Sequence, residues 1–349
     1  MGAALVVSGL LCAAVIGGAG SPSLPSATQL VSTSVDAATT SSCNSLQQLL
    51  GLCSTTTTST TTTSSTTTTM VPPTTTTTSG SSACAGEEPP VAAPSGTWSC
   101  TFDDEFNGTT LDTTKWQPQL TATSGYTTGY PNTVCYVDNP STISESGGSL
   151  NLSIVPATSS CDGVTTQYEG GMVTSYQLFS QQYGYFETRA DLPAYEKQGL
   201  QETLWMFPED ETKYGPWPDS GEIDYGEFYS EYPDNDIPVV HYPGSSNDPN
   251  ATNDYCTIAD TPTAGQFNTY ALLWTPTTIT AYFNGVPCIT DTYGSYVTSP
   301  DTSPEPFNQP FFMSFTAALG IGTNAFQPGT TPLPATTQID YMRVWQYGG

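Results

Sequence analysis

Apolar and polar residues alternate in short runs along the second two-thirds of the chain, and glycine, proline, asparagine and aspartate separate the runs. Residues 150–154 and 279–283 would each place alternate apolar side chains on one face of a strand. Asn284-Gly285 follows the second run directly, which is typical of a tight hairpin turn. Similar runs cover 183–192, 311–318 and 338–346, and no long stretch has a helical period. The pattern predicts an all-β fold, a sandwich or a barrel.

The first 95 residues lack this pattern. Threonine and serine make up nearly all of Ser54 to Ser82, which carries no charged residue. Such a segment cannot bury enough apolar surface to offset the entropy of ordering, so we expect a linker. The sequence therefore predicts a disordered Thr/Ser-rich segment over residues 22–95, followed by one folded domain over residues 96–349.

The apolar stretch from Ala3 to Ala19 is followed by small residues around a plausible cleavage region. This arrangement predicts a secretory signal peptide over residues 1–21 and a secreted, extracellular protein. The stretch is too short for a confident membrane span.

The chain is strongly acidic because it has few bases. Its 349 residues include 5 Lys and Arg against 32 Asp and Glu, a formal net charge of −27, although only 11% of residues are charged. Phosphate backbones and anionic lipids would be repelled, so neither nucleic acid nor a membrane is an expected partner. Carboxylates without basic partners repel one another, which raises their pKa values. We therefore expect an acid-tolerant protein that is most stable below pH 6.

Cysteine usage also points to export. Loss of Cys12 with the signal peptide would leave eight of the nine cysteines, an even number that suits disulfide bonding. No spacing resembles a zinc site. Sequence proximity suggests, without fixing, the pairs Cys43 with Cys53, Cys84 with Cys100, Cys135 with Cys161, and Cys256 with Cys288.

Three carboxylates lie close together in the segment from Trp217 to Phe228. On a regular strand, Glu222 and Asp224 share a face, which position 226, a glycine, would continue. A β-bulge at Tyr225–Gly226 would insert one extra residue and return Glu227 to that face. The spacing thus predicts three acids side by side on one bulged strand.

Three neighbouring acids cannot all ionise easily, so at least one should have a raised pKa. Retaining glycosidases need this asymmetry, because one carboxylate attacks the anomeric carbon and a protonated one donates to the leaving oxygen. Glu222 and Glu227 are the candidates, and Asp224 between them could hydrogen-bond the nucleophile. An acidic surface strand is the alternative interpretation. The adjoining tryptophan and the glycine at the bulge favour the catalytic one.

The same segment resembles the Glu-x-Asp-x-x-Glu signature of glycoside hydrolase family 16, in its bulged, laminarinase-like form. The resemblance implies a concave jelly-roll β-sandwich with a substrate cleft across one sheet. It also implies that Glu222 is the nucleophile, Glu227 the acid/base and Asp224 their assistant. The further segments that occur in the order of that family are 102–108, 183–193, 204–208, 267–274, 284–285, 306–310 and 339–345.

The resemblance also implies substrate-binding residues. Trp217 and Trp205 match aromatic residues that line the cleft, where an indole can stack on a sugar ring. His241 and Asn139 match a strand histidine and a sugar-contacting asparagine. Core packing for Trp205, a structural role for His241 and a turn role for Asn139 are the open alternatives.

No cofactor is expected for catalysis. Members of the family often hold a structural calcium, and Glu105, the carbonyl of Gly148 and Asp340 resemble its ligands. Oxygen atoms from distant segments are suitable ligands for Ca²⁺.

The expected function is that of a monomeric endo-glycosidase cutting β-1,3 or mixed β-1,3/1,4 glucans with retention. Residues 170–172 and 315–317 depart from the laminarinase pattern at sugar-binding positions, so agar, carrageenan or another galactan stays an alternative. Transglycosylation is also open, because a covalent intermediate can be intercepted by a sugar. A non-catalytic β-glucan-binding protein is disfavoured, since both glutamates are present.

Overall fold

The computed structural model describes residues 83–129, 132–161, 163–253, 256–259, 261–299 and 301–348. The signal peptide, the Thr/Ser-rich segment up to residue 82 and the proposed Cys43–Cys53 pair lie outside these residues.

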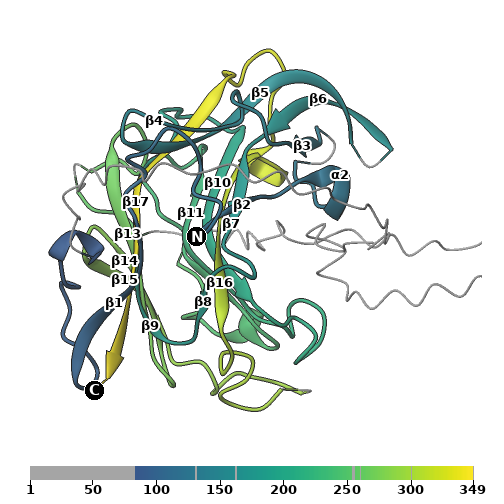
Figure 1. The fold of residues 1–349 in the computed structure, drawn as a ribbon. Helices are drawn as coiled ribbons and strands as arrows, with labels where there is room; N and C mark the ends of the chain where they lie inside the picture. Colours follow the sequence, from purple (N-terminus) through teal and green to yellow (C-terminus); the bar gives the residue numbers. More distant parts are fainter. Residues whose placement is uncertain are drawn as a thin grey trace, which may run out of the picture.

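The described residues form two facing β-sheets (Figure 1). The ten-stranded sheet has the order β15-β14-β13-β9-β17-β5-β6-β3, with β1 on β17 and β4 on β5. The bounds of its strands are β1 Thr97–Asp104, β3 Val134–Tyr136, β4 Ile143–Ser146, β5 Ser149–Cys161, β6 Val164–Gly170, β9 Gly184–Asp191, β13 Phe267–Trp274, β14 Ile279–Phe283, β15 Val286–Asp291 and β17 Ala335–Gly348.

The seven-stranded sheet has the order β12-β11-β10-β16-β7-β2, with β8 on β16. Its strands are β2 Gln117–Pro118, β7 Met172–Thr174, β8 Ser180–Gln181, β10 Leu200–Pro208, β11 Glu222–Tyr229, β12 Val239–His241 and β16 Phe311–Leu319. The only helices within the described residues are single turns, η1 Ala83–Gly86, α2 Thr121–Ser124, η2 Ser245–Asn247 and η3 Gly322–Asn324. The β-sandwich of the jelly-roll type that the sequence predicts is confirmed.

The core lies between the two sheets, where alternate side chains of facing strands meet. Phe186 of β9, Leu204 of β10 and Met342 of β17 are almost fully buried there. Each such side chain contributes about 1.5–3 kcal/mol by leaving water. A polar contact also crosses the core, because the hydroxyls of Thr188 on β9 and Tyr225 on β11 are 2.7 Å apart. This contact fixes which face of β11 is turned inward.

The end of the segment assigned to the linker packs on the outer face of the ten-stranded sheet. The Cys84–Cys100 disulfide ties η1 to β1. The indole N–H of Trp98 donates to the Val91 carbonyl at 2.8 Å, and that of Trp345 to the Glu87 carbonyl at 3.2 Å. The folded part therefore extends further toward the N-terminus than residue 96. Two tryptophans that would otherwise face water explain why this stretch packs.

Disulfides also join Cys135 to Cys161 and Cys256 to Cys288. Three of the four pairs that sequence proximity suggests are thereby confirmed.

Candidate active site

The bulge predicted in the acidic strand is present in β11. Against β10, Leu204 pairs with Gly226 and Trp205 with Asp224, which leaves Tyr225 as the extra residue. A Cβ on Gly226 would lie 3.0 Å from Cδ1 of Tyr270, tighter than ordinary packing. Glycine is therefore needed where the bulged strand presses on the core.

The bulge places the three carboxylates on one face. Tyr225 points inward to Thr188, so Glu222 and Asp224, which alternate with core-facing residues, point away from the ten-stranded sheet. All three residues are almost fully buried, with exposed fractions of 1% for Glu222, 4% for Asp224 and 3% for Glu227. Carboxylates so far from water are typical of a functional site rather than of a solvated acidic strand.

Glu222 is held by the loop that precedes its strand. The indole Nε1–H of Trp217 donates to its Oε2 at 2.6 Å. The rings of Trp217 and His241 lie 5.4 Å apart, so the indole also borders the next strand. A donor fixed on one oxygen orients the carboxylate.

Asp224 lies between the two glutamates and faces His241 of β12. His241 Nε2 is 3.2 Å from Asp224 Oδ2, and polar atoms of Glu222, Asp224 and His241 all lie within 4.8 Å of one another. Burial raises the pKa of Asp224 well above the ordinary range of an aspartate. A protonated Asp224 would donate a hydrogen bond rather than add charge beside Glu222.

Glu227 has its own partners on the same face. Gln201 Nε2 of β10 donates to its Oε1 at 2.7 Å, and the Tyr229 hydroxyl donates to the same carboxyl group. Burial, followed by the repulsion from Asp224, raises the pKa of Glu227, although both hydrogen bonds act against the increase. A carboxyl group that stays protonated near neutral pH can act as a general acid.

Gln201 and Tyr229 were not expected from the sequence. They lie directly opposite each other across β10 and β11, a register that the sequence does not specify. The only sequence signal that could have indicated these two residues is that polar side chains recur at alternate positions of two otherwise apolar strands.

Trp205 lies on the carboxylate face of β10, where its Nε1–H donates to Thr316 Oγ1 of β16 at 2.9 Å. Trp205 is only 5% exposed, so its ring is packed against neighbouring side chains as well as lying on the carboxylate face. Asn139 lies in a turn, with its Oδ1 accepting from the Ser141 amide and its Nδ2 donating to Glu169. These contacts match the turn role, and sugar binding by Asn139 stays a prediction.

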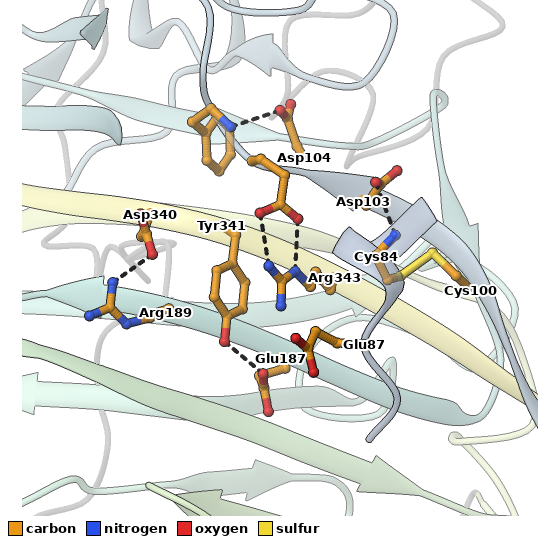
Figure 2. Close-up of polar contacts among 12 residues, drawn as sticks. Cys84, Glu87, Cys100, Asp103, Asp104, Glu187, Arg189, Asp340, Tyr341 and Arg343 are labelled. Carbon is orange, nitrogen blue, oxygen red and sulfur yellow. Dashed lines mark hydrogen bonds and ion pairs between the residues drawn. A yellow bond between two sulfur atoms is a disulfide. The ribbon is translucent and has the colours of Figure 1, made fainter. Parts of the chain in front are cut away.

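The carboxylates predicted to bind calcium are paired with arginines (Figure 2). Arg343 makes a two-pronged contact with Glu105, at 2.7 and 2.8 Å, and Arg189 Nη1 lies 2.6 Å from Asp340. Gly148 lies in the turn between β4 and β5. Since each carboxylate already faces a cation, this set does not fit Ca²⁺ as it stands, and calcium binding stays a prediction.

A β-sandwich that carries two glutamates in distinct environments on one face of a sheet has the arrangement that carboxylate-dependent glycoside hydrolases use. The model of a family described as "Beta-porphyranase A-D, GH16 domain" matches residues 99–347. The chain belongs to glycoside hydrolase family 16.

Characterised relatives are similar over about 70% of this chain. Glucan endo-1,3-beta-glucosidase A1 of Niallia circulans is 30% identical over 70% of the chain and 37% of its own length. Keratan-sulfate endo-1,4-beta-galactosidase of Sphingobacterium multivorum is 31% identical over 70% of the chain and 54% of its own length. The chain thus spans about a third to a half of these relatives.

Solved structures support the fold. SCLam, a non-specific endo-beta-1,3(4)-glucanase from family GH16, superposes with a TM-score of 0.62 at 25% identity, over 74% of this chain and 95% of that one. An endo-1,3-beta-glucanase from Pyrococcus furiosus gives a TM-score of 0.64 at 23% identity, over 74% and 98%. Within the described residues, no helix has the length and apolar character that a membrane crossing requires.

The contacts of Glu227 predict how its titration responds to mutation. Replacing Gln201 with Leu or Tyr229 with Phe removes a donor that stabilises the ionised carboxylate, so the pKa of Glu227 should rise further. A hydrogen bond to a charged group contributes about 1.5–3 kcal/mol, which corresponds to a pKa shift of about one to two units. We expect the alkaline limb of the kcat/KM profile to move upward by that amount in either variant.

Thr203→Ser is the matched control, because Thr203 lies on β10 directly opposite Glu227 and the substitution keeps its hydroxyl group. Its pH profile should follow that of the wild type. Lower activity with an unmoved alkaline limb in the Gln201 and Tyr229 variants would indicate a purely structural role for both residues.

Proposed function

We propose that this protein is a secreted endo-glycosidase that hydrolyses internal β-1,3 or mixed β-1,3/1,4 linkages of a glucan with retention of configuration. Glucan-hydrolysing relatives and the solved glucanase structures support the substrate class. The extracellular location is supported by three disulfides and by the apolar N-terminal stretch.

In the proposed reaction, Glu222 attacks the anomeric carbon while Glu227 protonates the departing glycosidic oxygen. The resulting glycosyl ester at Glu222 is then attacked by water, from which Glu227, now ionised, removes a proton. The pKa-raising environment of Glu227 suits the first step, and the donors Gln201 and Tyr229 stabilise its charge in the second. Trp217 holds Glu222 for attack.

The observation that carries this proposal is the bulge at Tyr225, because it brings Glu222 and Glu227 to one face with different partners. Without the extra residue, Glu227 would point into the core beside Tyr270. A fold-only or sugar-binding role does not require this placement.

The test is proton NMR of the first products released from laminarin and lichenan. Retention predicts that the new reducing end appears first as the β-anomer, and endo cleavage predicts a rapid fall in chain length. An α-anomer formed first would exclude double displacement. Reducing-sugar release across laminarin, lichenan and agarose identifies the linkage.

A galactan is the second candidate substrate. The matching family model is described as that of β-porphyranases, and one relative is a galactosidase by name. Faster hydrolysis of agarose than of either glucan would favour this candidate.

A further inference from the structure

The five lysines and arginines of this chain all lie within the described residues, so the position of each one is known. They are Lys115, Arg189, Lys197, Lys213 and Arg343. A site for sulfated or uronate-bearing sugars needs positive groups, above all arginines, whose planar fork binds such anions in pairs of hydrogen bonds. The position and partners of each cation therefore restrict the substrate.

Both arginines lie on the outer face of the ten-stranded sheet (Figure 2). On β17, Arg343 lies between the buried core residues Met342 and Val344, so its side chain points away from the other sheet. Its fork is taken by Glu105, and Arg189 is paired with Asp340. Neither guanidinium is available on the carboxylate face.

The lysines do not supply a positive site either. Lys115 donates to the Asp103 carbonyl beside β1. Lys213 lies in the loop that carries Trp217, where it donates to the Asn308 carbonyl at 3.1 Å. That loop holds four acids against this one lysine, namely Glu209, Asp210, Glu211 and Asp219.

Lys197 lines a groove of about 420 Å³ near the start of β10. The same groove is lined by Glu196 and Glu231, so its acids outnumber its base. Within the described residues, no helix exceeds four residues, and the long helix N-termini that bind anions elsewhere are therefore also missing.

The donors on the carboxylate face are uncharged. The N–H donors on this face are the indoles of Trp217 and Trp205 and the side-chain amide of Gln201. The imidazole of His241 lies beside them. An anionic substituent next to Glu222 would oppose ionisation of the nucleophile, because like charges raise a pKa. The face is thus suited to hydroxyl groups and unsuited to anions.

We propose that the polysaccharide bound at this face is uncharged in the sugars flanking the cleaved bond, a neutral glucan or galactan without sulfate or uronate groups there. This inference rests on the proposed function and narrows its substrate. It separates the chain from its relative that is named for a sulfated glycan.

The test uses two laminarin derivatives that differ only in charge, carboxymethyl and carboxamidomethyl laminarin of equal substitution, at pH 6. We expect kcat/KM for the carboxamide to exceed that for the carboxylate by about 100-fold at 10 mM NaCl, because like-charge contacts are strongly disfavoured. Raising NaCl to 150 mM, which shortens the screening length from about 30 to about 8 Å, should increase the rate on the carboxylate alone. Keratan sulfate and its desulfated form make the same comparison for a galactose-containing glycan.

Binding separates this inference from the proposed function. If the wild type hydrolyses no glycan, the proposed function fails, and calorimetry of Glu222→Gln with the two laminarin derivatives still decides the charge preference. Tighter binding of the carboxamide supports the inference. Equal or faster turnover of the carboxylate, equal or tighter binding of it, or binding of neither derivative overturns the inference.

Discussion

Replacing Glu222 or Glu227 with Gln should lower kcat on soluble glucan by at least about 10³-fold, because in the proposed reaction each variant lacks a group that forms or breaks a bond. Glutamine is nearly isosteric and removes the repulsion with Asp224, so neither variant should lose its fold. The measurement is reducing-sugar release combined with a thermal melt. Activity near that of the wild type in either variant would exclude that residue from catalysis.

The two roles can be told apart with azide. In a small-residue variant at Glu222, azide should take the place of the nucleophile and give a glycosyl azide of inverted configuration. In the corresponding variant at Glu227, the ester still forms on Glu222, so azide should give a product of retained configuration from an activated substrate. If the Glu222 variant gave the retained product and the Glu227 variant the inverted one, the roles of nucleophile and acid/base would be reversed.

Glu202→Gln is the matched control. Glu202 is also a buried acid next to this site on β10, but it faces the core and accepts from Thr337 Oγ1 at 2.7 Å. Its burial raises its pKa well above the ordinary value, which favours the protonated carboxyl that an amide imitates. Activity close to that of the wild type is expected.

The local part of the site could be predicted from the sequence. Strand period and one glycine were enough to place Glu222, Asp224 and Glu227 on one face, because both signals lie within six residues. Family resemblance added Trp217, whose contact with Glu222 spans only five positions.

The distant contacts could not be predicted. Gln201 reaches Glu227 across 26 positions and Arg343 reaches Glu105 across 238, so both depend on strand register and sheet order. The resemblance implies that Glu105 and Asp340 bind calcium, which stays a prediction, whereas their pairing with arginines of β17 and β9 was not expected from the sequence. Charge partners so far apart leave no periodic signal.

Thermal stability should rise as the pH falls from 8 toward 4. Burial raises the pKa of many carboxyls in the folded state, to about 7 for Asp291 and to about 6 for Asp301, and well above the ordinary value for Asp236. A raised folded pKa means that the native state binds more protons than the unfolded chain between the two pKa values. The destabilisation that each group causes at pH 8 therefore disappears as the pH falls through its folded pKa.

The usual loss of stability in acid should be weak here. Most proteins gain a large positive charge at low pH, whereas this chain has 5 Lys and Arg and one His to carry it. Asp112 acts in the opposite direction, since its hydrogen bonds from Thr114 lower its pKa and its contribution is lost in acid. Within the described residues, carboxyls whose pKa is raised by burial outnumber such groups, so their effect should dominate.

Asp291→Asn tests the cause at a single position. Asp291 is fully buried, and burial together with the neighbouring Asp248 raises its pKa. The amide imitates the protonated acid, so the variant should melt at a higher temperature than the wild type at pH 8 and at the same temperature at pH 4. Each kcal/mol corresponds to about 2–4 °C in a domain of this size.

Melting temperatures measured between pH 3 and pH 8 test both the pH dependence of the wild type and the effect of Asp291→Asn. We expect a wild-type maximum below pH 6 and a flatter curve for Asp291→Asn. A wild-type maximum at or above pH 7 would show that carboxylates stabilised by hydrogen bonds outweigh those destabilised by burial. Parallel curves for the two proteins would show that Asp291 is ionised at no cost in the native state, so that protonation of other groups carries the pH dependence.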